Sequence, residues 1–87
     1  MTSGPEIAQR AKEQLAQLTG HPADTVSALR RDEEGWHVTI DVLEMRYVPD
    51  TRDVLATYET LLDEDGTLLS YQRTRRYIRG EVGVEEA

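Results

Sequence analysis

The spacing of the apolar residues changes at Gly20, and this change constrains the fold more than any other feature of the sequence. Before Gly20 the spacing is that of one helix face, with apolar side chains at Ile7, Ala8, Ala11, Leu15 and Leu18. Ser3 and Glu6 fit a capping box at the helix start, and Gly20 and Pro22 are typical of a helix end. From Thr25 onward apolar and polar residues alternate, as in half-buried β-strands.

The alternating region divides into four expected strands. Two acidic turns that are close copies of each other, at 32–35 and 63–66, both end in glycine and are typical of hairpins. The apolar positions change parity after Val42, which predicts a β-bulge or a strong bend within a long second strand. We expect strands at 26–31, 36–47, 54–62 and 67–79.

These patterns predict an α+β fold in which one N-terminal helix packs on a four-stranded antiparallel β-meander. We expect a single domain over residues 1–80 and an acidic flexible tail over 81–87. Trp36 has the same parity as the apolar positions of its strand, so we expect it to be buried beneath the helix.

The composition narrows the function classes. The chain has 87 residues, a formal net charge of -7 and no cysteine, which excludes disulfides and thiolate chemistry. No apolar run approaches the roughly 18 residues that span a bilayer, and no apolar leader is present, so we expect a cytoplasmic protein without a membrane partner. The negative charge also argues against bulk attraction to nucleic acid, although a local basic patch still acts over roughly 8 Å.

Few residues suit catalysis or metal binding. The acids gather in turns and near the C-terminus, where water leaves carboxylates without the shifted pKa values that general acid–base catalysis needs. His37 and Asp41 share one side of a strand, but the four-residue spacing separates them by roughly 13 Å, too far for joint ligation. We therefore expect no enzyme activity, no cofactor and no metal site.

The most unusual segment lies at 71–79, with four of the ten Lys and Arg residues and no acid. Because alternating residues of a strand point the same way, one side of it should carry a row of large groups, with Arg76 on the other side. We predict that this row binds a partner; its members are Tyr71, Arg73, Arg75, Tyr77 and Arg79.

Several interpretations of the row stay open, among them a mixture of roles or simple solubility. If Leu62 pairs with Thr67 across the second turn, Tyr58 faces Tyr71, and the arginines meet small apolar neighbours, which favours a recognition surface. Acids from elsewhere could still pair with the arginines and make the row an internal ladder; the candidates are Glu44, Asp50 and Asp53. A third hypothesis is RNA or other nucleic-acid binding, because arginine interleaved with tyrosine can grip phosphates and stack bases.

Two stretches are specific enough to suggest a family. One is Pro-Asp-Thr…Asp-Val-Leu-Ala-Thr-Tyr-Glu within 49–59, and the other is Tyr-x-Arg-x-x-Arg-Tyr-x-Arg-Gly at 71–80. Together with 35–42, they resemble the gas vesicle protein O family over roughly residues 8–80. The resemblance implies an accessory protein for gas vesicle assembly, implies no enzyme or cofactor, and assigns no role to single residues. A small acidic chain with a thin core suits an adaptor or chaperone, in the cytoplasm or on the vesicle. We expect other accessory proteins and the shell subunit as partners, with self-association as a further option.

Overall fold

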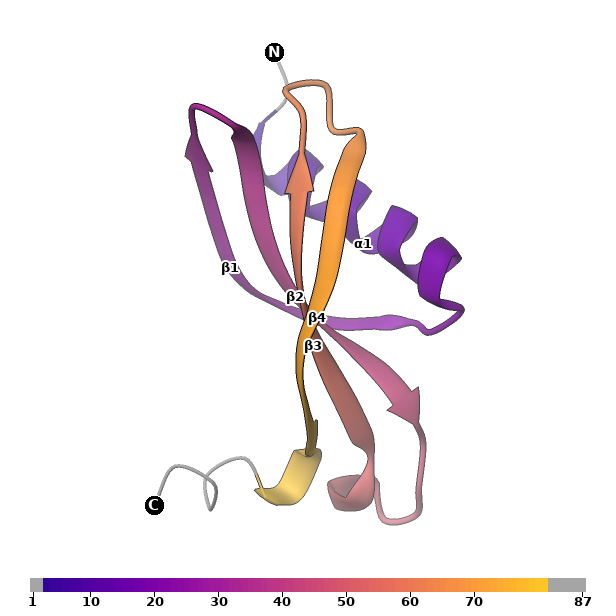
Figure 1. Ribbon diagram of the computed structural model, residues 1–87. Coiled ribbons are helices and arrows are strands. Elements are labelled where there is room, and N and C mark those ends of the chain that lie inside the picture. The colour runs from indigo at the N-terminus through magenta and orange to yellow at the C-terminus, as the bar shows by residue number, and fades with distance from the viewer. Residues whose placement is uncertain (1–2, 82–87) are drawn as a thin grey trace.

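The computed structural model describes residues 3–81 as one helix against one sheet (Figure 1). The antiparallel sheet has the strand order β1-β2-β3-β4. The elements are α1 (Gly4–Thr19), β1 (Ala23–Asp32), β2 (Gly35–Met45), η1 (Asp50–Arg52), β3 (Val54–Leu62), β4 (Leu68–Ile78) and η2 (Arg79–Glu81), where η marks a 3-10 helix. The predicted α+β fold is confirmed. The predicted tail lies outside the described residues, except that Glu81 ends η2.

Helix α1 begins and ends at the predicted signals. The N–H of Glu6 donates to Ser3 Oγ at 3.4 Å, and the N–H of Ser3 donates to the Glu6 carboxylate at 3.4 Å. This is the predicted capping box, which satisfies two backbone donors that a helix start leaves free. At the other end Gly20 has φ +77°, and its N–H donates to the carbonyl of Ala16 at 2.9 Å.

The core lies between α1 and one side of the sheet. From the helix, Ile7, Ala11 and Leu15 are completely buried. They pack against buried residues of β2 and β3, namely Val38, Ile40, Val42, Ala56 and Leu62. Figure 1 shows that α1 lies behind the upper part of the sheet only, while the ends of β2 and β3 next to η1 extend below it.

Trp36 lies at the margin of this core. It packs against the core cluster but is only half-buried, so the expected full burial beneath the helix is not reached. The guanidinium of Arg31, its ladder partner on β1, lies 5.7 Å from the centre of the indole. The ring is therefore held between the core and a cation at the edge of the sheet.

The packing of α1 against the sheet should depend far more on the buried Leu15 than on the exposed Leu18. Leu15→Ala should lower the free energy of unfolding by about 2–5 kcal/mol, because it leaves a cavity in a completely buried site. Leu18→Ala, at a side chain that is 56% exposed, should change it by less than about 0.5 kcal/mol. Urea unfolding followed by circular dichroism measures both, and equal losses would contradict this packing.

Candidate functional site

A β-bulge in β4 interrupts the predicted arginine row. Tyr58 of β3 pairs with Arg73, whereas the preceding Thr57 pairs with Arg75, so Thr74 has no ladder partner. The Thr74 hydroxyl instead donates to the carbonyl oxygen of Thr57 at 3.2 Å. One extra residue in a strand moves every following side chain to the other side of the sheet.

The prediction that the five row residues share one side is therefore wrong. Tyr71 and Arg73 lie on the side that α1 covers, because their ladder partners Thr60 and Tyr58 face the helix. After the bulge, Arg75 and Tyr77 lie on the opposite side. Arg76, expected alone on the other side, instead lies on the same side as Arg73.

The register of the second hairpin also differs from the expectation. Leu62 was predicted to pair with Thr67, but Thr67 belongs to the turn: its N–H donates to Asp63 Oδ1 at 2.9 Å, and its carbonyl accepts from the N–H of Asp63 at 2.9 Å. Leu62 pairs with the following residue instead. Tyr58 and Tyr71 are consequently not direct partners, although their ring centroids lie 6.1 Å apart as a diagonal contact.

Two arginines of β4 share one acid from β2. Glu44 occupies the bulge that the parity change after Val42 predicted, between the ladder positions Leu43 and Met45. Its carboxylate lies 3.0 Å from Arg76 Nε and 3.3 Å from an Arg73 terminal nitrogen. The Glu44 side chain is only 10% exposed, whereas both arginines are about half exposed. The internal-ladder interpretation thus holds for this part of β4, and the arginines still reach solvent.

Arg79 joins both edges of the sheet. Its guanidinium lies 3.1 Å from Asp24 of β1 and 3.4 Å from Asp53, whose side chain is 4% exposed. Asp53 also accepts from the N–H of Tyr47 at 2.7 Å. The hydrogen bond from Arg79 lowers the pKa of Asp24 below its usual 3.8, although burial opposes this shift. We call Arg79, Asp24 and Asp53 the arginine clamp, an internal contact and not a free recognition group.

Tyr77 is also engaged within the protein. Its hydroxyl donates to Asp41 Oδ2 at 2.7 Å, and the Thr57 hydroxyl donates to Asp41 Oδ1 at 2.7 Å. Burial, with the negative charge of Asp41 as its hydrogen-bond partner, raises the pKa of Tyr77 to about 12. The guanidinium of Arg75 lies 4.6 Å from the centre of the Tyr77 ring. Asp41 therefore serves this network and not a joint site with His37.

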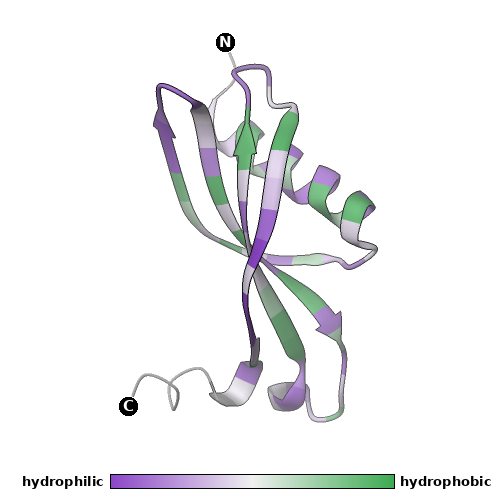
Figure 2. Cartoon of the chain, viewed as in Figure 1, coloured by the Kyte–Doolittle hydropathy of each residue, from purple (hydrophilic) through white to green (hydrophobic). Residues whose placement is uncertain are grey.

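The side that α1 covers continues past the helix as an uncovered apolar row. Met45, Val54 and Ile78 are direct ladder neighbours on β2, β3 and β4. They face the helix side, because Val54 lies two residues from the core residue Ala56 on a strand without an extra residue. Met45 is 47% exposed and Ile78 37%. The apolar colouring at this end of β2 and β3 is visible in Figure 2.

The connection after β2 extends this row. Tyr47 is 39% exposed and Val48 95%. A hollow of about 420 Å³ lies beside Tyr47, lined by Tyr47, Thr51, Arg52, Val54, Ile78 and Gly80. The guanidinium of Arg52 lies 5.9 Å from the centre of the Tyr47 ring. We call Met45, Tyr47, Val48, Val54 and Ile78 the distal surface. The sequence did not predict this surface. The change of apolar parity after Val42 predicts a bulge before Met45, but it does not show that Met45 then lies beside Val54 and Ile78.

Comparisons with known proteins agree on one family. A family model described as gas vesicle synthesis protein GvpO matches residues 2–83. Gas vesicle protein O of Streptomyces sp. (strain CB03234) is 52% identical over 67 residues, which cover 77% of this chain and 52% of that protein. Gas vesicle protein O1 of Halobacterium salinarum is 34% identical over 76 residues, covering 87% and 64%. Gas vesicle protein O of Haloferax mediterranei is 30% identical over 77 residues, covering 87% and 55%.

The chain spans between about half and just under two thirds of the length of these relatives. No solved structure matches the chain significantly. Within residues 3–81, no helix has the length and apolar character needed to cross a membrane.

The arginine clamp should make Arg79 a stability residue. Arg79→Met should lower the free energy of unfolding by about 1–2 kcal/mol near neutral pH, because the buried Asp53 loses its cation; partial exposure of Arg79 keeps the loss below that of a fully buried pair. Asp24 contributes its share of this stability above pH 3.8, and that share disappears as the pH falls through the lowered pKa of its carboxyl group. The difference between wild type and variant in urea unfolding should therefore shrink at acidic pH.

Arg30→Met is the matched control, since Arg30 pairs with Asp32 but its side chain is 66% exposed. Its effect should stay below about 0.5–1 kcal/mol. If Arg79→Met lowers the free energy of unfolding no more than Arg30→Met does, the arginine clamp does not stabilise the fold. Arg79 would then again be a candidate for partner recognition.

Proposed function

Because the chain belongs to the gas vesicle synthesis protein GvpO family, we propose that it serves gas vesicle assembly as a non-enzymatic adaptor or chaperone. It acts in this proposal through protein–protein contacts, in the cytoplasm or on the vesicle. The partners are other gas vesicle accessory proteins, with the shell subunit as a further one. The family supports the assembly role, while the mechanism, the partners and the location belong to the proposal.

The observation that carries the adaptor mechanism is the exposure of the distal surface. Side chains such as Met45, Val48 and Ile78 are costly to leave in water, and contiguous exposed apolar groups mark interaction sites more often than chance. Arg52 and Arg76 lie at the border of this surface, beside Tyr47 and Ile78 respectively. An apolar patch bordered by guanidinium groups suits a partner segment with apolar side chains flanked by carboxylates.

The exposed part of the arginine row extends the same contact. As β4 is an edge strand, a partner along this edge meets Tyr71 and Arg73 on one side and Arg75 on the other. Backbone pairing is a poorer option, because bulges at Leu69 and Thr74 interrupt the edge, and bulges hinder strand addition. The proposed contact is therefore made by side chains. Tyr77 and Arg79 contribute by holding β4 in position.

The geometry does not favour the nucleic-acid alternative. Base stacking along one strand needs aromatic rings on the same side of the sheet. Tyr71 and Tyr77 lie on opposite sides, and the Tyr77 hydroxyl is engaged with Asp41. Nucleic-acid binding remains a distinguishable outcome of the experiment below.

Met45→Glu tests the distal surface. The variant protein replaces the wild type in cells that make gas vesicles, and the bound proteins and RNA are identified after capture on beads. We expect at least a tenfold loss of the captured partner and loss of flotation, because a carboxylate would be buried against apolar and acidic groups of the partner. The melting temperature should change little, since Met45 is 47% exposed.

Leu18→Glu is the matched control, because Leu18 is 56% exposed but lies on helix α1 and not on the proposed contact along β4. It should retain capture and flotation. Equal capture by Met45→Glu and wild type would exclude the distal surface as the contact. Captured RNA whose release rises steeply with salt would establish the nucleic-acid alternative instead.

A further inference from the structure

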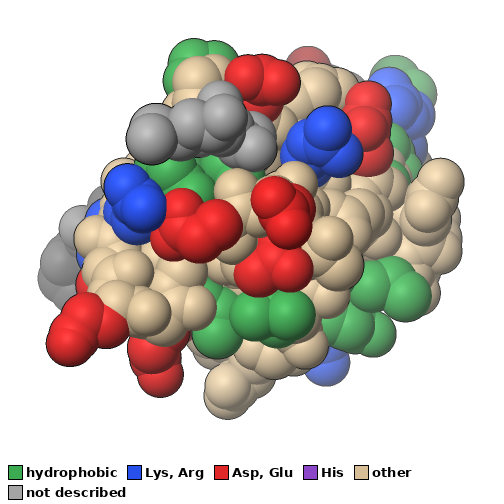
Figure 3. Space-filling model, turned by 90° about the horizontal axis from the view of Figure 1, so that it is seen from above, with side chains coloured by type: hydrophobic (Ala, Val, Ile, Leu, Met, Phe, Trp, Pro, Cys, Tyr) green, Lys and Arg blue, Asp and Glu red, His purple; other side chains and the backbone are tan. Residues whose placement is uncertain are grey.

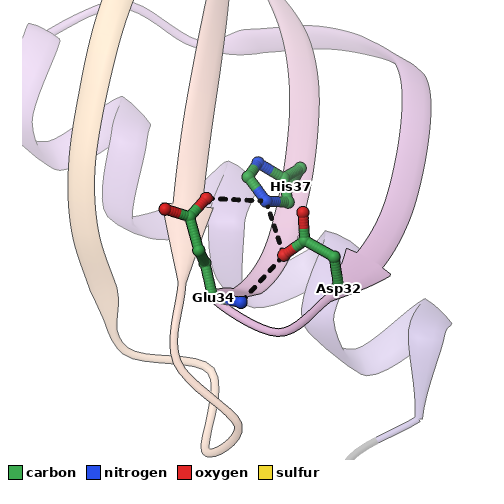
Figure 4. Close-up of side chains that lie close together, drawn as sticks. All are labelled: Asp32, Glu34 and His37. Carbon is green, nitrogen blue, oxygen red and sulfur yellow. Dashed lines mark hydrogen bonds and ion pairs between the residues drawn. The ribbon is translucent and has the colours of Figure 1, made fainter.

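A second group of side chains lies at the other end of the sheet, at the turn between β1 and β2. Acidic side chains gather on this end of the molecule (Figure 3). Among them, His37 Nε2 lies 2.9 Å from Asp32 Oδ1 and 3.6 Å from Glu34 Oε1 (Figure 4). The three side chains offer one nitrogen and two oxygen ligand atoms, all within 4.8 Å of one another.

The hairpin holds this group in place. His37 belongs to the inner strand β2, with Arg30 and Leu61 as its ladder partners, and its side chain is only 24% exposed. The N–H of Glu34 donates to Asp32 Oδ1 at 2.9 Å, and Arg30 binds the other Asp32 oxygen at 2.9 Å. These two contacts orient the Asp32 carboxylate, so that Oδ1 faces the imidazole.

Gly35 fixes the turn between the ligand-bearing residues. Its φ of +137° lies in the region that glycine favours, and an added Cβ would collide with the carbonyl oxygen of Leu62. The neighbouring β3 strand therefore approaches the turn so closely that only glycine fits. This contact sets the positions of Glu34 and His37 on either side of Gly35 before any ligand arrives.

We propose that Asp32, Glu34 and His37 bind a divalent transition-metal ion of the Zn²⁺ type. Metal–ligand bonds of about 2.0–2.2 Å place neighbouring ligand atoms about 2.8–3.1 Å apart in octahedral and about 3.3–3.6 Å apart in tetrahedral geometry. The observed 2.9 Å and 3.6 Å fall near the two ends of this span. An imidazole nitrogen favours Zn²⁺, Ni²⁺ or Cu²⁺ over Mg²⁺ and Ca²⁺, which prefer oxygen ligands. Water fills the remaining coordination positions.

The imidazole distinguishes this turn from an ordinary acidic one. The second turn carries Asp63, Glu64 and Asp65, but its carboxylates have other roles: Asp63 Oδ1 accepts from two backbone N–H groups, and Glu64 pairs with Arg31 at 2.8 Å. Within residues 3–81, the turn before His37 is the only place where three ligating side chains converge. The second turn therefore supplies a control of equal charge and similar sequence.

Calorimetric titration of the tag-free protein with ZnCl₂ at about neutral pH tests the proposal. We expect Zn²⁺ to bind, and Mg²⁺ and Ca²⁺ to bind far more weakly. His37→Gln and Glu34→Gln should each weaken Zn²⁺ binding at least about tenfold. Asp65→Asn removes the same charge as Glu34→Gln but should leave the affinity within about twofold. Zn²⁺ should also raise the melting temperature of the wild type, since a ligand of the folded state stabilises it.

Glu34→Gln keeps the test valid if His37→Gln fails to fold, because the Glu34 side chain is 70% exposed and retains its backbone contacts. Amide chemical shifts that move on Zn²⁺ addition at residues 32–37 but not at 63–67 would place the ion at the proposed turn. No Zn²⁺ binding at millimolar concentration would overturn the proposal. Equal affinity in Glu34→Gln and Asp65→Asn would do the same, since it would assign the ion to the general acidic surface.

Discussion

The strict two-residue alternation of side chains along a β-strand governs this structure, and the bulges decide where it changes phase. Every extra residue transfers the rest of its strand to the opposite side of the sheet. In β2 the extra residue is Glu44, which then meets Arg73 and Arg76 of β4. In β4 there are two, Leu69 and Thr74, and the second sends Arg75 to the other side. A continuous run of arginines along the chain thereby becomes separate groups with different environments.

The lengths of the helix and the strands create the second division. Helix α1 has 16 residues and spans about 24 Å, whereas the 11 residues of β2 extend over about 36 Å. The helix therefore cannot cover the whole side on which it packs. The core occupies the covered part, and the row of Met45, Val54 and Ile78 continues the same apolar side without cover. The distal surface, which we propose as the contact for gas vesicle assembly, includes the part of this side of the sheet that the helix leaves uncovered.

The two ends of the sheet consequently differ in chemistry. Each hairpin turn carries three acids, His37 lies beside the first turn, and glycines hold both turns tight. The opposite end combines exposed apolar side chains with the clamp of Arg79, Asp24 and Asp53, which joins the outer strands. This separation leaves a chain with a net charge of -7 a local surface that combines exposed apolar side chains with the guanidinium groups of Arg52 and Arg76.

The sequence by itself determined the elements and their order, because these depend on local signals. The Ser3–Glu6 cap, the stop at Gly20, the two hairpin glycines and the parity change near Met45 each act within a few residues. Only the tertiary structure decided the neighbours. The bulge at Thr74 leaves no apolar parity change, since the strand there is polar on both sides, and so the split of the arginine row was invisible in the sequence. Strand pairing brings Arg79 to Asp24, 55 positions away in the chain. Turn geometry gathers Asp32 and Glu34 around His37. Hydrophobic periodicity encodes neither of these contacts.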